Sequence, residues 1–261
     1  MTLLVVGLSI LNSSKSNFEY SSKIKNVNGI KLNSDFSNIK LVSNSSDLYI
    51  DIQGQKTILG EPNIDITYSK DKAIINVLTI NKFWKKLLPS LRNKSEIVLN
   101  VPPGLLADIQ LETKNGKIDV EQVTGASRLS LTSDVGTIRM NNFQGELLNI
   151  NAGNGSIHLG EVDGQINIRN KVGSLKSLVL KSINGINNIN IANGNVKVQL
   201  PNVTQIDDIG LNISTKNGKI LSKEHKLNVI KKGPGKEVLH NTLNSEAKLN
   251  ISVLVGNIEI D

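Results

Sequence analysis

The chain has 261 residues, a formal net charge of +7 and only 3% aromatic residues. This length can bury a substantial hydrophobic core, and the scarcity of aromatic rings means that Ile, Leu and Val must build it. The chain has no Cys, which excludes disulfides, Cys-ligated zinc sites and thiol nucleophiles.

The first residues, MTLLVVGLSILNSSKS, contain an apolar run from Leu3 to Leu11. The run is too short to span a bilayer, which takes about 20 residues. It is either a first strand or stub, or the remnant of a signal or membrane anchor, and we favour the second interpretation. We expect an apolar N-terminal segment over residues 1–16, a truncated signal or anchor, followed by a single β-repeat domain over residues 17–261.

Residues 82–94, KFWKKLLPSLRNK, carry five basic residues, no acidic residue and the only Trp of the chain. Apolar side chains recur there at near-helical spacing, although Pro89 would kink a helix. The segment is either an amphipathic cap over an open end of the fold or a surface segment that contacts anionic head groups or wall polymers. The candidate surface-contact residues are Lys82, Phe83, Trp84, Lys85, Lys86 and Arg92.

The hexapeptide TKNGKI occurs at residues 113–118 and again at 215–220. Both copies belong to a longer frame, in which an apolar–x–apolar triplet is followed by Gly six residues after its middle position. The middle positions that fit this frame are Gln110, Ser130, Asn149, Asn167, Asn212 and Asn250. At Ile189-Asn190-Ile191 the Gly comes after four residues instead, and a weaker early unit surrounds Lys31.

A unit of two short strands cannot bury its apolar face alone, so neighbouring units must stack. An antiparallel meander of hairpins would do this, but a parallel stack explains better why like positions hold like residues. We predict an all-β, right-handed β-helix-like solenoid of about seven two-strand repeats of about 20 residues, with a short amphipathic insertion. In this frame Leu148 and Ile150 face the core and Asn149 faces outward.

Two details of the frame are further expectations. Insertions are predicted after Ile168 and between Ile220 and Leu249, where the spacing is lost. A second glycine series is predicted to mark the turn back between units. Its members are Gly125, Gly145, Gly164 and Gly185.

The repeat register, the segment SEIVLNVPPG leading into IQLETKNGKIDV, and the Gly-x-Ile-x-Val endings resemble the bacterial adhesin-like family whose domain of unknown function is called the toastrack domain. The resemblance covers roughly residues 27–261 and includes the Lia-type envelope-stress proteins. It implies a β-helix-like extracytoplasmic domain, commonly behind a membrane segment, and it brings no catalytic residues to this chain.

The outward middle positions of the triplets form a column of amides. Stacked amides can hydrogen-bond from rung to rung as a structural ladder. Alternatively, an amide-rich face can bind polysaccharide, although the column lacks aromatic platforms for sugars. The candidate Asn ladder consists of Asn149, Asn167, Asn190, Asn212 and Asn250.

Catalytic, metal and cofactor sites are not expected. The column after the turn mixes charges, as Asp119, Arg139, His158 and Lys197, without the paired acids of a glycan-cleaving enzyme. The pair Asp207-Asp208 is explained by a turn. The histidines lack metal-ligand spacing, and no phosphate-binding Gly motif is present.

The basic excess is localised in residues 82–94 and 219–236, and aromatic stacking platforms for nucleic acid are missing. We therefore predict a non-enzymatic, extracytoplasmic cell-envelope scaffold or interaction domain, at the cell surface or outer face of the cytoplasmic membrane. Its expected partner is an anionic membrane, a wall polymer or a membrane protein, with no cofactor and no nucleic acid. The alternative is a carbohydrate-binding surface adhesin that uses the Asn-rich face.

Overall fold

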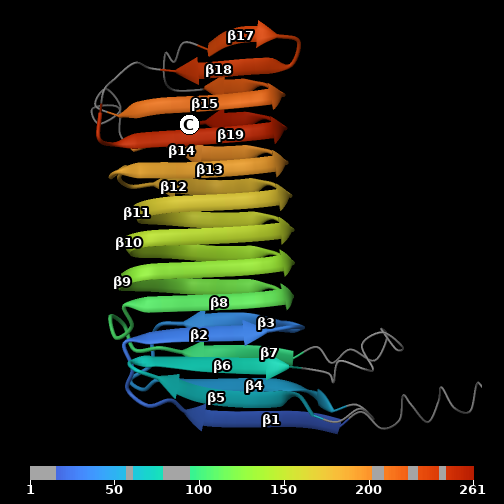
Figure 1. Ribbon diagram of the computed structural model, residues 1–261, viewed down its shortest axis with the longest axis vertical. Helices are drawn as coiled ribbons and strands as arrows, with labels where there is room; N and C mark the ends of the chain where they lie inside the picture. Colours follow the sequence, from blue (N-terminus) through green and yellow to red (C-terminus); the bar gives the residue numbers. More distant parts are fainter. Residues whose placement is uncertain (1–15, 57–60, 79–94, 202–208, 223–228, 241–244) are drawn as a thin grey trace, which may run out of the picture.

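The computed structural model describes residues 16–56, 61–78, 95–201, 209–222, 229–240 and 245–261, which form a stack of β-coils. In Figure 1 the coils lie above one another along the long axis, with one strand of each coil in a front layer and the next in a back layer. Residues 1–15 and the basic segment 82–94 lie outside the described residues. Over the described ranges, no helix is long and apolar enough to cross a membrane.

Neighbouring coils in the centre of the stack pair in parallel and in register. Ile138 pairs with Ile118 on one side and with Ile157 on the other. Like positions therefore lie above one another at about 4.8 Å, which confirms the predicted solenoid over the hairpin meander. The central strands are β8 (Asp108–Asn115), β9 (Ile118–Val135), β10 (Ile138–Asn154), β11 (Ile157–Val172), β12 (Leu175–Leu180), β13 (Ile186–Asn193) and β14 (Val196–Gln199).

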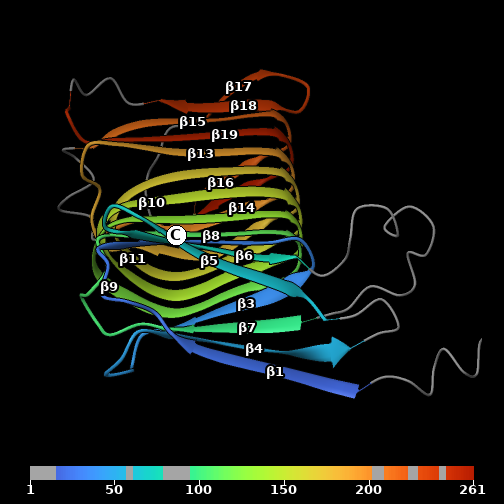
Figure 2. The same cartoon turned by 60° about the horizontal axis from the view of Figure 1, so that its bottom comes forward.

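The long strands β9, β10 and β11 contribute to both layers because each bends at a corner. In β10 the register with the neighbouring coils shifts between Gln144 and Leu147, next to Gly145 of the second glycine series. Gly125, Gly145 and Gly164 therefore lie at bends within the continuous strands β9, β10 and β11 and not at hairpin reversals, whereas Gly185 lies between β12 and β13. Figure 2, tilted by 60°, shows these strands curving from one layer into the other.

The stretch after Ile168, which we predicted to be an insertion, is a regular part of a coil. Leu175 pairs in parallel with Ile157 on one side and Val196 on the other. The prediction is wrong because a single irregular residue, Ser177 with a φ of 62°, disturbs the spacing without breaking the coil.

At both ends of the stack the spatial order departs from the chain order. The strands of these end coils are β2 (Gly29–Ser34), β3 (Ser37–Val42), β6 (Lys72–Leu78), β7 (Ser95–Asn100), β15 (Gly210–Asn217), β16 (Ile220–Ser222), β19 (Lys248–Val255) and β20 (Ile258–Ile260). The first coil, β2–β3, lies between β6–β7 and β8–β9. The last coil, β19–β20, lies between β13–β14 and β15–β16.

Antiparallel strands cover both ends of the solenoid. They are β1 (Ser16–Lys23), β4 (Tyr49–Lys56), β5 (Asn63–Ser69), β17 (Val229–Gly233) and β18 (Lys236–His240). Strand β5 pairs with β6, β4 pairs with β7 and β1, and β18 pairs with β15 and β17. Strands β5, β4 and β18 occupy the outer edges of β6, β7 and β15, which would otherwise be open for aggregation. The predicted insertion between Ile220 and Leu249 is confirmed, and it supplies the β17–β18 hairpin.

The core lies between the two layers and is almost entirely aliphatic. Leu148, Ile150 and Ile157 are buried, whereas Asn149 and His158 are partly exposed, as the alternation predicts. Among the described residues Phe143 is the largest fully buried side chain, and it lies just before the bend of β10. This rigid core holds the outward side chains of each coil at a fixed spacing.

Candidate functional site

The candidate amides lie on the outer surface of the front layer. Asn149 pairs with Asn167, and Asn250 pairs with Asn188 on one side and Asn212 on the other. Within this column, Asn250 donates from Nδ2 to Oδ1 of Asn188 at 3.0 Å. The stack therefore brings four of the five candidate residues into one column.

Asn190 does not belong to this column. It pairs with Arg169 and Ser252 in the next outward column, two residues further along each strand. Asn188 takes the place in the column that we assigned to Asn190. Counted from Asn188, the corner glycine Gly194 follows after six residues, as in the other units. The predicted register is wrong here because the residue before Asn188 is polar although it faces inward.

That inward residue is Asn187, which is fully buried. Its Oδ1 accepts a hydrogen bond from the backbone N–H of Ile166 at 2.8 Å, and its Nδ2 donates to the carbonyl of Asn184 at 3.1 Å. A weaker contact of 3.4 Å reaches the carbonyl of Lys248. Asn187 thus connects its own coil to both neighbouring coils, a role for which the sequence pattern gave no signal.

Side chains three residues before the corner glycines form a second set that sequence reasoning missed. They donate to carbonyl oxygens of the adjacent corner, and this explains the Thr that begins both copies of the hexapeptide. The bonds run from Thr113 to Ser37 (3.0 Å), Ser133 to Gly116 (3.1 Å), Asn170 to Gly155 (2.9 Å) and Thr215 to Gly256 (2.8 Å).

An amide ladder also runs along the residues that follow the corner glycines. Asn195 Oδ1 accepts from the backbone N–H of Asn257, and Asn257 Oδ1 accepts from that of Lys219, both at 2.9 Å. The Gly-Asn pairs at 194–195 and 256–257 were the available signal. These bonds stabilise the stack and occupy polar groups that would otherwise face a ligand.

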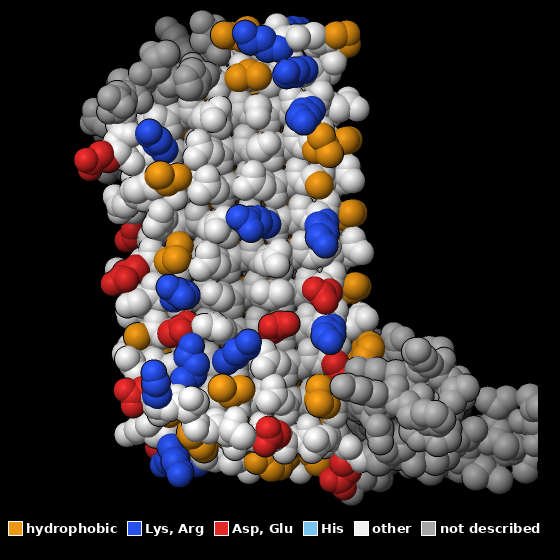
Figure 3. All heavy atoms as spheres, viewed as in Figure 1, with side chains coloured by type: hydrophobic (Ala, Val, Ile, Leu, Met, Phe, Trp, Pro, Cys, Tyr) orange, Lys and Arg blue, Asp and Glu red, His pale blue; other side chains and the backbone are white. Residues whose placement is uncertain are grey.

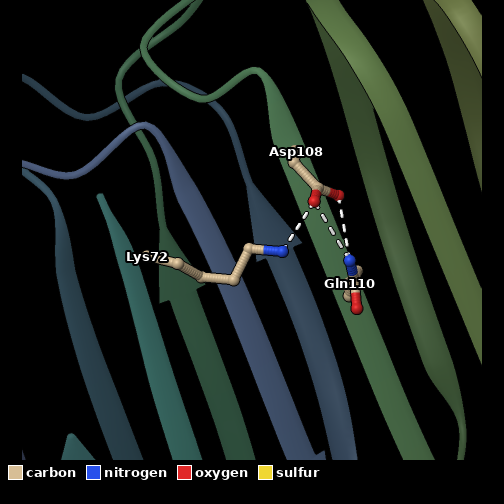
Figure 4. Close-up of polar contacts among 3 residues, drawn as sticks. All are labelled: Lys72, Asp108 and Gln110. Atoms are coloured by element: carbon tan, nitrogen blue, oxygen red, sulfur yellow. Dashed lines mark hydrogen bonds and ion pairs between the residues drawn. The ribbon is translucent and has the colours of Figure 1, made fainter. Parts of the chain in front are cut away.

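An ion pair lies near the N-terminal end of the stack, beside a cavity of about 450 Å³. In Figure 4, Lys72 Nζ reaches Asp108 Oδ2 at 2.7 Å, and Gln110 Nε2 donates to the same carboxylate at 3.0 Å. Burial alone would raise the pKa of Asp108, but the hydrogen bonds from Lys72 and Gln110 lower it below its usual value. A carboxylate held ionised in this way is unsuited to donate a proton.

The Lys72–Asp108 pair spans the first coil of the chain. Both residues pair with Gly29, which lies between them in the sheet. A Cβ on Gly29 would lie 3.1 Å from Cε of Lys72, so the glycine leaves room for the side chain to cross. The pair therefore acts as a staple over the inserted coil β2–β3.

The back layer carries the mixed column that we judged unsuited to catalysis. His158 lies next to Arg139 in this column, and burial, followed by the charges of Lys176 and Arg139, lowers its pKa. At the other end Lys197 forms ion pairs with Glu259 and Asp261. Within the described ranges, no three His, Asp or Glu side chains are placed to hold a metal ion. Asp207, Asp208 and His225 lie outside these ranges.

A shallow groove of about 390 Å³ runs along the C-terminal half of the front layer. We call it the basic groove, because Arg169, Lys171 and Lys216 line it and no acidic residue does. Asn151, Asn190 and Ser252 supply its polar floor. Figure 3 shows Lys and Arg side chains over the upper half of this face, with Asp and Glu only at its left edge.

The sequence matches the family description Toastrack DUF4097 twice, over residues 27–159 and 106–261. No curated protein matches it.

Three similar solved structures are described as a "putative cell adhesion protein" from Clostridium sporogenes, a "putative adhesin" from Bacteroides fragilis and a "putative lipid binding protein" from Parabacteroides distasonis. Their sequence identities are 15%, 13% and 10%, and their TM-scores are 0.35, 0.41 and 0.31. The similarity covers 94%, 95% and 94% of this chain and 99%, 98% and 97% of theirs.

Proposed function

The chain belongs to the Toastrack DUF4097 family, and on this premise we propose that it is a non-enzymatic, extracytoplasmic protein of the cell envelope. It serves as a β-repeat scaffold or interaction domain near the membrane surface, in the envelope-stress response. The observation that carries the proposal is the continuous outward face of amide and hydroxyl side chains along the stack. Such a face suits extended contact with a partner better than the enclosure of a small substrate.

The polar clusters of the described residues support a role without catalysis. The Lys72–Asp108 pair connects the two coils on either side of the coil β2–β3, and the Lys197 pairs connect neighbouring coils. A charged group that is held by such a partner stabilises the stack and is poorly placed to exchange protons with a substrate.

Membrane contact is proposed for the basic segment 82–94, which joins Leu78 of β6 to Ser95 of β7. These strands form the outermost parallel coil at the N-terminal end, so the described residues on both sides of the segment lie near that end. Phe83 and Trp84 would insert into the interface while the cations meet anionic lipid, wall polymer or the acidic surface of a membrane protein. Each Lys or Arg near an anionic membrane contributes on the order of 1 kcal/mol.

Co-sedimentation with anionic and neutral vesicles at low and physiological salt tests this contact. Wild-type protein should bind anionic vesicles at low salt, Trp84→Ala should bind more weakly, and replacing Lys85 and Lys86 by Glu should abolish salt-sensitive binding. Thermal melts distinguish the alternative of a cap. If the wild type ignores anionic vesicles while Trp84→Ala melts early, the membrane role is wrong.

A second candidate function, a carbohydrate-binding surface adhesin, is favoured by the amide column and the basic groove. Asn167 projects from the middle of this face, between Asn149 and Asn188. Asn167→Asp should weaken the stack if the column is only a structural ladder, and it should weaken glycan binding if the column is a recognition surface. A glycan array beside a thermal melt separates these two results.

A further inference from the structure

We propose that the basic groove binds an acidic linear polysaccharide, which lies parallel to the axis of the solenoid. This inference rests on the second function above, carbohydrate binding, and names the class of glycan and the residues that hold it. Arg169, Lys171 and Lys216 pair with the acidic groups of the chain, while Asn151 and Asn190 hydrogen-bond to its hydroxyls.

The charge of the groove selects the class of ligand. All three cations are exposed, and the front-layer segments of the five coils from β10 to β15 include no Asp or Glu. These segments are residues 147–154 of β10, 165–172 of β11, 186–193 of β13, 248–255 of β19 and 210–217 of β15. Nearer the N-terminal end, the same face carries the acidic residues Glu112 and Asp134. Neutral sugars are usually held on aromatic rings, and none lines the groove. An acidic glycan therefore gains more here than a neutral one.

The shape of the groove selects a linear chain that follows the stack. Lys171 lies in β11, and Lys216 lies in β15, three coils further along the stack. At about 4.8 Å for each coil, the two side chains lie roughly 14 Å apart along the axis. The coil spacing is close to the length of one sugar ring in a polysaccharide, so successive sugars meet equivalent positions of successive coils.

Other anionic polymers fit the groove less well. Single-stranded nucleic acid is usually held by base stacking on aromatic side chains, which this groove lacks. An anionic membrane would need apolar side chains that protrude from the surface, whereas Leu254 is the one large exposed apolar residue among those lining the groove.

The chain offers a matched control for the test. Lys216 and Lys114 occupy the same position in the two copies of TKNGKI. Their strands, β15 and β8, present them on the same face, but Lys114 lies outside the groove, next to Asp134 in the register. Lys216→Ala and Lys114→Ala therefore remove the same charge from the same local structure.

The experiment measures binding of the full chain by calorimetry, with polygalacturonate and hyaluronan as acidic probes and chitin oligosaccharides as neutral ones. At least one acidic probe should bind, and its affinity should rise with chain length until the oligosaccharide spans the groove. Lys216→Ala should weaken it about three- to ten-fold, and Lys114→Ala less than two-fold. Replacing Arg169, Lys171 and Lys216 together by Gln should abolish binding while leaving the melting temperature unchanged, because all three are exposed.

Several outcomes would overturn the inference. If chitin oligosaccharides bind and neither acidic probe does, the protein binds carbohydrate but the class of glycan is wrong. If acidic probes bind the triple variant as well as the wild type, the site lies elsewhere. Equal losses for Lys114→Ala and Lys216→Ala would indicate unspecific charge attraction. Binding of single-stranded RNA or anionic vesicles through the groove residues, in preference to both glycans, would assign the groove to another partner. The vesicle test of residues 82–94 is independent of all these results.

Discussion

At the scale of single residues, the corner glycines are required mainly because two backbones approach each other closely. Gly155 has a φ of 159°, and a Cβ placed on it would collide with the carbonyl oxygen of Gly136 in the next coil. Positive φ is the usual reason for a glycine in a turn. The closer constraint is the parallel stacking itself, which places the carbonyl of one corner where a side chain of the next would begin.

The first prediction separates these two causes. Gly155→Ala should destabilise the fold by about 3 kcal/mol or more, since strain in φ and overlap with a backbone oxygen add. Gly104→Ala is the matched control, because Gly104 has a φ of 70° but open space around its Cβ. It should cost only about 1–2 kcal/mol. Chemical denaturation measures the free energy of unfolding of both variants. Equal losses of stability would show that the close approach of the two backbones at Gly155 has no effect.

The second prediction concerns pH. Burial and the charges of Lys176 and Arg139 lower the pKa of His158 below 6.5, so the unfolded chain binds the proton more tightly than the folded one. The stability linked to His158 is complete above about pH 6.5 and is lost as the pH falls through the lowered pKa.

Between pH 7.5 and 5, the melting temperature of the wild type should therefore fall more than that of His158→Gln. Parallel melting curves, or a steeper fall in the variant, would contradict this assignment.

At the scale of elements, β13 shows how a polar residue can replace a core residue without breaking a coil. The equivalent positions in neighbouring coils are Ile166 and Leu249, both fully buried. Asn187 fills this position and satisfies backbone groups that the ladder leaves open at the edge of the coil. A buried polar group is tolerated when its hydrogen bonds are made.

The third prediction sets the sequence pattern against the structure. Asn187→Leu restores the apolar triplet, and from the pattern alone it should stabilise the coil. Instead, we expect a loss of about 1–3 kcal/mol, because the buried N–H of Ile166 would have no partner. Asn190→Leu, at an exposed position of the same strand, is the control and should change stability by less than about 0.5 kcal/mol. Urea denaturation of both variants tests whether the Asn187 variant loses more stability than the control.

At the scale of the whole molecule, the first and last coils of the chain lie inside the stack. Strand β2 lies between β6 and β8, and β19 lies between β13 and β15. Chain ends usually fray because they have few partners. Here both terminal coils have a parallel neighbour on each side, and the outer parallel coils, β6–β7 and β15–β16, come from within the chain.

The fourth prediction follows from this order. Amide protons of β19 should exchange as slowly as those of the central strand β10, although β19 lies near the C-terminus. Those of β17, the outermost strand of the C-terminal cap, should exchange faster by a factor of ten or more, since opening β17 breaks only one pairing. Native-state hydrogen exchange measures all three strands in one experiment. Fast exchange in β19 would mean that the last coil opens independently of its neighbours.

The sequence by itself determined the coil. Alternating apolar residues such as Leu148 and Ile150, followed by a corner glycine, are local features, and local backbone and burial preferences suffice to produce a two-layered coil that must stack. The amide column followed from the same alternation. The alternation did not predict the cap strands, the coil of β6 and β7, or the register of Asn187. In these places an intervening segment or a polar core residue interrupts the repeat pattern.

The tertiary structure alone decided the order of the coils. Every coil presents the same backbone donors and acceptors at its edges, so backbone hydrogen bonds would form equally well between any two coils. The order of the coils is therefore selected by the fit of side chains that are distant in the chain. The residues before the corner glycines show the result, since in spatial order they alternate strictly between Asn and Val. They are Asn115, Val135, Asn154, Val172, Asn193, Val255 and Asn217. In chain order Asn217 precedes Val255 and the alternation is lost. The dimensions of the basic groove depend on the same order, because β19 between β13 and β15 places Lys171 and Lys216 three coils apart.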